Sequence, residues 1–465
     1  MHHHTSLIVA GASLLMVGHV TIASQAGGHI PNLKAYANVS GEARTLASQG
    51  AIDTSNPFFQ SLGSNGRACV NCHEPGEGWS ITPAGIRARF DETDGLHPLF
   101  RLVDGANAPN APVATVEQRR EAYSLLLNKG LIRVSMPIPD GAQFRLAAVD
   151  DPYHHAHAGE INMYRRPLPT ANINFVSAVM WDGRESVIPA NQPYLKPQDE
   201  HFRHQSQSAV FGHAEGGAIS QEQQQAMVDF QRSLCVAQST DRMAGELHGG
   251  GAKGGPLPMA KQSFYMGLND SILPDPTGVA STNKVFDLYE AWLNAPGNSS
   301  VSAARRSIAR GEQLFNTKPI RITGVSGVND DLNAPLVVGT CTTCHNNPNI
   351  GNHTMRRALN IGLTDAGERT ADLPLYTLER LDANGQPTGE LKKTTDPGRA
   401  MVTGQWKDVG RFKGPVLRGL AARAPYFHNG LAATLEETVD FYDRRFDIGF
   451  TSQERADLAA FLRAL

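Results

Sequence analysis

The sequence predicts a mainly α-helical protein made of two similar halves, with a large loop-rich insertion in the first half. Apolar residues recur at helical spacing around a short cysteine- and histidine-containing motif that occurs once in each half. A Gly- and Pro-rich segment, residues 245–258, separates the halves and is typical of a linker. With 465 residues, of which 40% are hydrophobic, the chain is long enough to bury more than one core.

Four segments carry the helical pattern. Ser220 is a typical N-cap residue, and Thr434 with Glu437 fits the capping-box pattern. The predicted helices, with the apolar residues expected to face the core, are 220–234 (Met227, Phe230, Leu234), 301–315 (Ile308, Leu314, Phe315), 434–446 (Leu435, Val439, Tyr442, Phe446) and 452–465. Cys235 is expected to be a buried structural thiol in a helix. Residues 91–165 have little periodicity and many Pro, Asn and Asp residues, which predicts the loop-rich insertion.

The first residues are typical of an export signal. Residues 6–18 form an apolar run of signal-peptide length, and Ala23 and Ala26 offer cleavage sites, although histidines stand where Lys or Arg is usual. No later apolar run is long enough to span a bilayer. The net charge of −3 favours neither a nucleic acid nor an anionic membrane as a partner. We expect residues 1–26 to be removed and the mature protein to be periplasmic, with no membrane span.

The halves share a second pattern besides the cysteine motif. A Pro-led segment runs from Pro169 to Trp181 in the first half and from Pro415 to Phe427 in the second, with equal spacing and a Gly turn just beyond. This weak repeat favours duplication of one domain. The expected organisation is a signal peptide (1–26), a first domain (27–244) with an insertion at about 91–165, a linker (245–300) and a second domain (301–465).

The cysteine motifs carry the chemistry. Cys69-Val70-Asn71-Cys72-His73 and Cys341-Thr342-Thr343-Cys344-His345 are two complete C-x-x-C-H sequences in a chain with 5 cysteines. In this motif both thiols can form thioether bonds to haem and the His can ligate the iron. A zinc site or a thioredoxin-like redox pair would not need the adjacent His. The sequence therefore predicts two covalently attached c-type haems, which are assembled outside the cytoplasm.

The order of motifs resembles that of a known family. C-x-x-C-H, Trp181-Asp182-Gly183-Arg184, a second C-x-x-C-H and Pro425-Tyr426-Phe427-His428-Asn429-Gly430 follow one another as in the bacterial dihaem cytochrome c peroxidase and MauG superfamily. The resemblance covers residues 55 to 465. It implies two all-α, cytochrome c-like domains, with peroxide chemistry at the first haem and electron transfer at the second. The long insertion and residues 165–170 resemble a Tyr-ligated subgroup.

Tyr442 distinguishes members of the family. In the conventional peroxidases a Met ligates the second haem at a fixed distance after the motif His, and this chain has Tyr442 at that distance from His428. MauG-like enzymes also carry Tyr there. A phenolate is a hard, anionic ligand that favours oxidised iron, whereas a thioether favours ferrous iron. The alternative is that Tyr442 is a core aromatic on its helix.

The resemblance implies further roles. Trp181 would lie between the haems as a charge relay, or be an ordinary core Trp. Glu215 is the candidate acid/base for peroxide cleavage, unless it is a solvated loop residue, and His213 would assist it or act as a distal ligand. His428 would support the second haem. The cluster of His154, His155 and His157 is an alternative source of a distal ligand or a polar loop.

The resemblance also implies a bound calcium ion, which this sequence neither supports nor excludes. The family's peroxidases hold Ca2+ between the haems with an Asn side chain and backbone carbonyls. Arg423 and Pro425 would supply carbonyls here, but Arg166 stands at the position of the Asn and cannot ligate Ca2+. Another oxygen would have to replace the Asn.

Taken together, the sequence predicts a periplasmic dihaem peroxidase. H2O2 would be reduced at the haem held by His73, and oxidising equivalents would pass by way of Trp181 to the haem held by His345 and Tyr442. Its partner would be a small redox protein as electron donor, or a protein that it oxidises. The alternatives are a conventional cytochrome c peroxidase with a small cytochrome donor, a non-catalytic dihaem electron carrier, and an oxygenase acting on an organic substrate.

Overall fold

The computed structural model describes the chain except residues 1–27, 158, 187–198 and 273–274, so the predicted signal peptide lies outside the described residues. The α-helices are α1 (Pro83–Thr93), α2 (Val116–Ala122), α3 (Ser124–Lys129), α4 (Asp199–Ala214), α5 (Gln221–Arg232), α6 (Pro256–Met259), α7 (Ser300–Thr317), α8 (Ala400–Thr403), α9 (Leu435–Phe446) and α10 (Ser452–Ala464). The strands are β1 (His29–Ile30), β2 (Ala35–Asn38), β3 (Gly41–Ala47), β4 (Ile52–Asp53), β5 (Ile132–Pro137), β6 (Phe144–Asp150), β7 (Glu160–Arg165), β8 (Leu234–Asp241), β9 (Gly245–Glu246), β10 (Ile320–Ile322), β11 (Val337–Gly339), β12 (Ala358–Leu359), β13 (Leu375–Leu381), β14 (Pro387–Thr394) and β15 (Phe412–Lys413).

The fold is mixed, and the prediction of a mainly α-helical protein is wrong in this respect. The structure has 31% helix and 19% strand, and the strands of the described residues form six small sheets. Cys235 is buried as expected, but it lies in β8, at the centre of the sheet β2-β3-β8-β9, and not in a helix. The apolar run 234–237 is too short for its periodicity to distinguish a strand from a helix.

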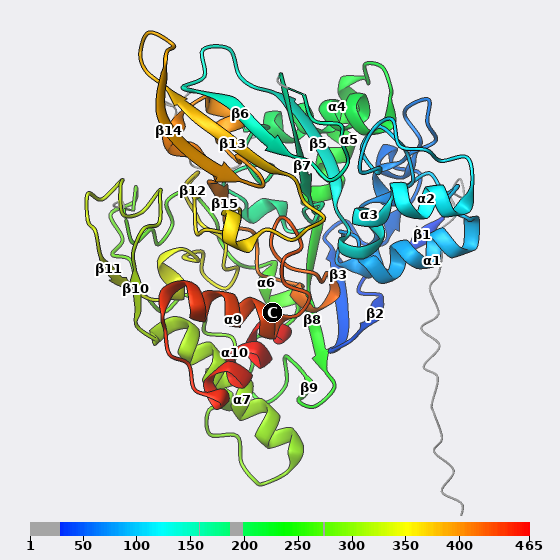
Figure 1. The fold of residues 1–465 in the computed structure, drawn as a ribbon. Helices are drawn as coiled ribbons and strands as arrows, with labels where there is room; N and C mark the ends of the chain where they lie inside the picture. Colours follow the sequence, from blue (N-terminus) through cyan, green and yellow to red (C-terminus); the bar gives the residue numbers. More distant parts are fainter. Residues whose placement is uncertain (1–27, 158, 187–198, 273–274) are drawn as a thin grey trace, which may run out of the picture.

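The insertion contains more regular structure than expected. It includes α2 and α3, and β5 pairs antiparallel with β7. Strand β6 pairs antiparallel with β13 of the second half, and β13 pairs with β14 (Figure 1). Phe144 and Met163 of the insertion share a buried cluster with Tyr376 and Leu378. The insertion therefore joins the two halves.

The helices of the second half pack as one group. α7, α9 and α10 lie together in the lower part of Figure 1. Gly311 of α7 faces the Asp457 carbonyl of α10 so closely that a Cβ would lie 2.0 Å from that oxygen, and this lets the two helices touch. Ile308 and Phe315 are buried in their shared core as predicted, and Leu314 is half-buried. The Thr434 hydroxyl caps α9 by accepting from the Glu437 N–H.

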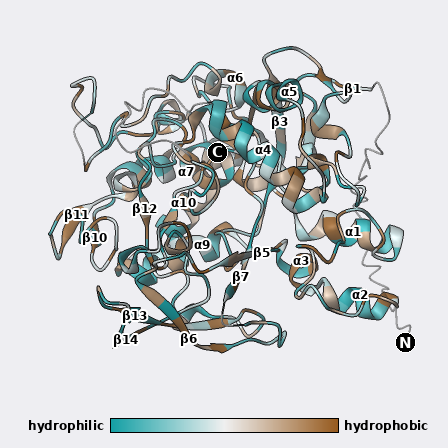
Figure 2. Cartoon of the chain, turned by 90° about the horizontal axis from the view of Figure 1, so that it is seen from above, coloured by the Kyte–Doolittle hydropathy of each residue, from teal (hydrophilic) through white to brown (hydrophobic). Residues whose placement is uncertain are grey.

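The remaining segments complete one body. In both views α1 and α2 lie on one side of the molecule and β10 and β11 on the other (Figure 2). Ser220 caps α5 as predicted, and Phe230 of α5 packs against Trp79. Residues 285–292, within the predicted linker, are part of the core that α7 and α10 share. Among the described residues, no helix is both long and apolar enough to cross a membrane.

Candidate functional site

The two C-x-x-C-H motifs have the same backbone arrangement. Each begins with a 3-10 turn, in which the second cysteine and the histidine both donate their N–H groups to the carbonyl of the first cysteine. The distances are 3.1 and 3.0 Å to Cys69, and 3.3 and 3.1 Å to Cys341. This turn places both thiols and the imidazole of each motif beside one cavity. The local repeat predicted from the sequence is therefore also a structural repeat.

Both motif histidines are oriented to present the same nitrogen. His73 Nδ1 lies 3.1 Å from the Trp79 carbonyl, and His345 Nδ1 lies 2.6 Å from the Gly351 carbonyl. Because a carbonyl oxygen can only accept, each Nδ1 is the protonated nitrogen and each Nε2 keeps its lone pair. Burial lowers the pKa of His73 to about 4 and also lowers the pKa of His345. Both rings are therefore neutral and available to a metal through Nε2.

The four motif cysteines are free thiols. Burial raises the pKa of Cys69, Cys341 and Cys344 to about 12, and that of Cys72 to about 11. These thiols are protonated at neutral pH and are therefore weak nucleophiles, and among the described residues no group of three or more His, Cys, Asp or Glu side chains could hold a metal ion. Their placement fits a covalent attachment role better than a metal-thiolate site.

The cavity beside the second motif has a volume of about 190 Å³ and walls made largely of apolar side chains. One face of α9 lines it, through Leu435, Thr438, Val439, Tyr442 and Phe446. The predicted apolar stripe of this helix thus faces the cavity, and Tyr442 lies in the same cavity as His345. Burial raises the pKa of Tyr442 above its usual value, and the Cys344 and Cys341 thiols add to this rise.

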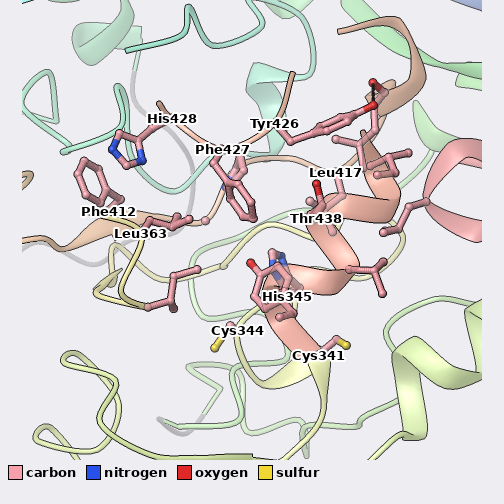
Figure 3. A pocket seen from close by; sticks show the side chains of 18 of the residues that line it. Cys341, Cys344, His345, Leu363, Phe412, Leu417, Tyr426, Phe427, His428 and Thr438 are labelled. Carbon is pink, nitrogen blue, oxygen red and sulfur yellow. Dashed lines mark hydrogen bonds between the residues drawn. The ribbon is translucent and has the colours of Figure 1, made fainter. Parts of the chain in front are cut away.

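The opposite wall of this cavity comes from a different part of the chain. Phe412, Phe427 and His428 lie across from the two cysteines and His345 (Figure 3). The His428 ring stacks on Phe412 at a centroid distance of 3.9 Å. Its Nε2 is buried without a hydrogen-bond partner among the described residues, and burial lowers the pKa of His428 to about 4. A neutral imidazole therefore supports the wall of the cavity.

Three cations in this wall, two of them buried and one half-buried, form no direct ion pair with a carboxylate of the described residues. They are Arg166, Lys413 and Arg423, which donate to backbone carbonyls. Burial lowers the pKa of Arg166 to about 9, that of Lys413 to about 8 and that of Arg423 to about 10. Buried positive charges normally have a counter-ion. An apolar cavity with thiols, a free imidazole nitrogen and cations that have no directly paired carboxylate fits haem, whose two propionates are anionic.

One segment separates the two cavities. Pro167 lines both the second cavity and a cavity of about 110 Å³ beside the first motif. Trp181 Nε1 donates to the carbonyl of the preceding residue, Arg166, at 2.8 Å, and the Arg166 N–H donates to the His428 carbonyl at 2.7 Å. The Trp181 and His428 rings are 6.1 Å apart. Trp181 is thus attached to the wall between the cavities.

A buried ion network lies behind this wall. Arg165 Nε and Nη2 donate to both carboxylate oxygens of Asp396, at 2.7 and 2.8 Å, and Nη1 donates to Asp182 at 2.5 Å. These three side chains are at most 3% exposed. The network connects the Trp-Asp-Gly-Arg motif to the second half. No pattern in the sequence indicates Asp396, which lies far from both partners along the chain.

The first cavity contains a hydrogen-bonded pair that only the structure identifies. His213, at the end of α4, lines this cavity, and its Nδ1 lies 2.5 Å from a carboxylate oxygen of Asp104. The other oxygen of Asp104 pairs with buried Arg67. Burial acts to raise the pKa of Asp104, but Arg67 and His213 outweigh it, so the pKa lies below its usual value. Asp104 belongs to the insertion, which therefore contributes to the site.

Glu215 lies at the edge of this region. Its side chain is exposed and accepts from Asn65 Nδ2 at 3.0 Å, and it is not among the residues that line the first cavity. Its backbone has a φ of +51°, a conformation that costs energy for a residue with a side chain. His154, His155 and His157 line neither cavity. Of the residues proposed for the distal side, the structure brings His213 to the cavity.

Parts of the chain are similar to known proteins. No model of a protein family matches the chain. The chain is 32% identical over 205 residues to cytochrome-c peroxidase IdrP1 of Pseudomonas sp. (strain SCT), which covers 41% of the chain and 46% of that protein. It is 34% identical over 139 residues to the protein of that name from Denitromonas iodatirespirans, covering 27% of the chain and 36% of that protein. Over these partial lengths the chain is similar to cytochrome-c peroxidases.

One further curated protein and one solved structure also align with the chain. Over 74 residues the chain is 40% identical to cytochrome c551 peroxidase of Nitrosomonas europaea, covering 16% of the chain and 22% of that protein. A solved MauG-like protein associated with microbial copper homeostasis aligns over 81% of the chain and 89% of its own length, with 16% identity and a TM-score of 0.32. The chain spans less than half the length of the curated relatives it matches.

Proposed function

We propose that this chain is a periplasmic c-type peroxidase with two haems, in which peroxide is reduced at the His73 site and the oxidation is shared with the His345 site. Haem bound at each motif would supply the redox chemistry. The chain's residues would hold the haems, exclude water, move protons and connect the two sites. The names of the curated relatives support peroxide as the substrate.

One observation carries the proposal. The two cavities share Pro167 in their walls, and Trp181 is hydrogen-bonded to the residue before it. An indole in this position offers a π-system between two sites that would otherwise have to exchange charge through aliphatic packing. His428 and Phe412 continue the row of aromatic rings into the second cavity. Sharing of oxidising equivalents needs such a connection.

His213 is the acid/base that the geometry favours at the first site. Asp104 holds Nδ1, so Nε2 is the nitrogen left free to exchange a proton with bound peroxide. The Asp104 carboxylate would stabilise the positive charge that the ring acquires when it takes the proton. Arg67 keeps that carboxylate ionised and in place. Glu215 would have to turn inward from its exposed position to share this role.

Tyr442 would complete the second site opposite His345. Its hydroxyl has no hydrogen-bond partner among the described residues, and Tyr442 lines the cavity that also contains the motif thiols and the imidazole of His345. As a ligand to iron it would ionise and stabilise the oxidised state. This favours storage of oxidation after peroxide has reacted over uptake of an electron beforehand. We therefore propose the MauG-like form, with a redox protein or an oxidised protein as the partner.

A specific observation also supports the electron-carrier alternative. The free Nε2 of His213 lines the same cavity as His73, so His213 could instead ligate the iron and close the first site. Such a protein would carry two closed haems and would not react with peroxide. The experiment below separates the two functions.

The test is the optical spectrum, through the near-infrared, of the fully ferric protein after one equivalent of H2O2. Rapid changes at both haems with a new near-infrared band are expected. Trp181→Phe should confine the rapid change to one haem, while Trp406→Phe, a control that lines neither cavity, should behave as wild type. Reaction only after one-electron reduction would contradict sharing and indicate a conventional peroxidase. No reaction in either state would leave the electron carrier.

A further inference from the structure

The geometry points to Arg166 as a built-in cation that joins the two halves and takes the place of the calcium ion used by the superfamily, so that this protein works without calcium. This inference goes beyond the proposed function and does not depend on it. It concerns the stability of the junction between the haem sites, whatever reaction the haems perform.

Four backbone carbonyls surround the Arg166 guanidinium. Nη1 donates to the Lys129 carbonyl at 2.8 Å, and Nη2 donates to Ile81 at 2.5 Å, to Arg423 at 3.2 Å and to Ala424 at 3.3 Å. Ile81 and Lys129 belong to the first half, and Arg423 and Ala424 precede the Pro-Tyr-Phe-His motif of the second. One side chain therefore ties together three chain segments.

The electrostatics are those of a cation site. Arg166 is 5% exposed and forms no ion pair with a carboxylate of the described residues, so backbone carbonyls accept all of these hydrogen bonds, while the charge of Glu77 favours the cation from farther away. Burial, with Arg423 nearby, lowers the pKa of Arg166 to about 9, which still leaves it charged at neutral pH. Carbonyl oxygens are also ligands for calcium. Here they already hold a positive charge, and a divalent ion at the same place would be repelled by it.

The surrounding chain is adapted to this side chain. Gly130 has a φ of +64°, and a Cβ at this position would lie 2.3 Å from Arg166 Nη1. Glycine therefore makes room for the guanidinium as well as for the turn that ends α3. The four residues whose carbonyls surround the guanidinium, which we call the carbonyl cage, offer no side-chain carboxylate or amide oxygen in place of the missing Asn. The expected calcium site does not fit this chain.

Arg166 also holds in place the residues proposed to connect the haems. The Arg166 carbonyl accepts from the Trp181 indole, and its N–H donates to the His428 carbonyl. Movement of the Arg166 backbone would therefore move both rings. An internal cation, unlike a calcium ion, cannot dissociate when the metal concentration falls.

The first experiment uses the wild-type holoprotein. Thermal unfolding and the Soret spectrum are recorded in 1 mM CaCl2 and after EGTA treatment and gel filtration, with metal content measured in parallel. We expect the same Tm and spectrum in both and no bound calcium. A Tm lowered by EGTA, or one calcium ion retained per chain, would overturn the inference.

Variants at Arg166 test the cage itself. Arg166→Asn removes the cation and supplies an amide oxygen, so we expect a Tm lower by several degrees that CaCl2 partly restores. Arg166→Met removes the cation without supplying an oxygen, so its Tm should be lowered by a similar amount and CaCl2 should not restore it. Arg166→Lys keeps the positive charge, so its Tm should be lowered least of the three variants. An Asn variant that is stable without calcium, or that responds to calcium no more than the Met variant, would show that the carbonyls do not form a cation site.

Discussion

The role of His213 yields the sharpest prediction, because the chain offers two candidates for the same proton transfer. We predict that His213→Gln slows the reaction of the ferric protein with H2O2 by about 100-fold to 1,000-fold, whereas Glu215→Gln slows it less than about 10-fold. Gln keeps a hydrogen-bonding group near Asp104 but cannot carry a proton between the peroxide oxygens. Glu215 already points to solvent and to Asn65.

The magnitude follows from the position of the ring. General acid–base catalysis by a positioned group is worth about 100-fold to 10,000-fold, or roughly 3 to 5 kcal/mol of barrier at 1.36 kcal/mol per tenfold. The His213 side chain is 36% exposed, so water can replace part of its function, and the lower part of the range applies. Asp104 orients the ring, so Asp104→Asn should cost about 10-fold to 100-fold.

The assay is stopped-flow absorbance in the Soret region at several peroxide concentrations, which gives a second-order rate constant for each variant. Thermal unfolding and the ferric spectrum serve as controls, because Asp104→Asn leaves buried Arg67 without its partner. The reasoning would be refuted if Glu215→Gln lowered the rate constant by 100-fold or more while His213→Gln reacted at the wild-type rate. Faster reaction of His213→Gln would show instead that His213 closes the iron.

Three further predictions concern other sites. Tyr442→Phe should raise the midpoint potential of the second haem by on the order of 100 mV, measured by spectroelectrochemistry, since axial ligands span about 0.8 V; an unchanged potential would exclude Tyr442 as a ligand. Asp182→Asn should lower the free energy of unfolding by about 3 kcal/mol, because it leaves buried Arg165 with one carboxylate instead of two; calorimetry would show it, and Asp447→Asn is an exposed control. Burial raises the pKa of Glu312 to about 7, so its contribution to stability is full below its unfolded pKa of about 4 and is lost as pH rises to 7. Between pH 4.5 and 8 the free energy of unfolding of wild type should therefore fall by roughly 3 kcal/mol relative to that of Glu312→Gln, and its Tm should fall with it. Parallel pH profiles of the two proteins would contradict this.

The helices and the strands of this protein differ in how far the sequence predicts them. Helices with caps and long amphipathic stripes, such as α5, α7, α9 and α10, were predictable because their signals lie within one segment. The strands were not predictable, because β6 is stabilised by pairing with β13, more than two hundred residues away. Neither strand has a sequence pattern that indicates which strand it pairs with. The same reason explains why Cys235 was assigned to a helix when it belongs to the centre of a sheet.

The site divides in the same way. The sequence by itself determined the two C-x-x-C-H motifs and the face of α9 that carries Tyr442, because their chemistry depends on spacing within a single turn or helix. Only the tertiary structure decided which side chains meet across the cavities: Asp104 with His213, Arg165 with Asp396, and Arg166 with the carbonyls of both halves. These contacts join buried charges to partners distant in the chain. Their energies depend on burial and distance, and the order of residues along the chain encodes neither.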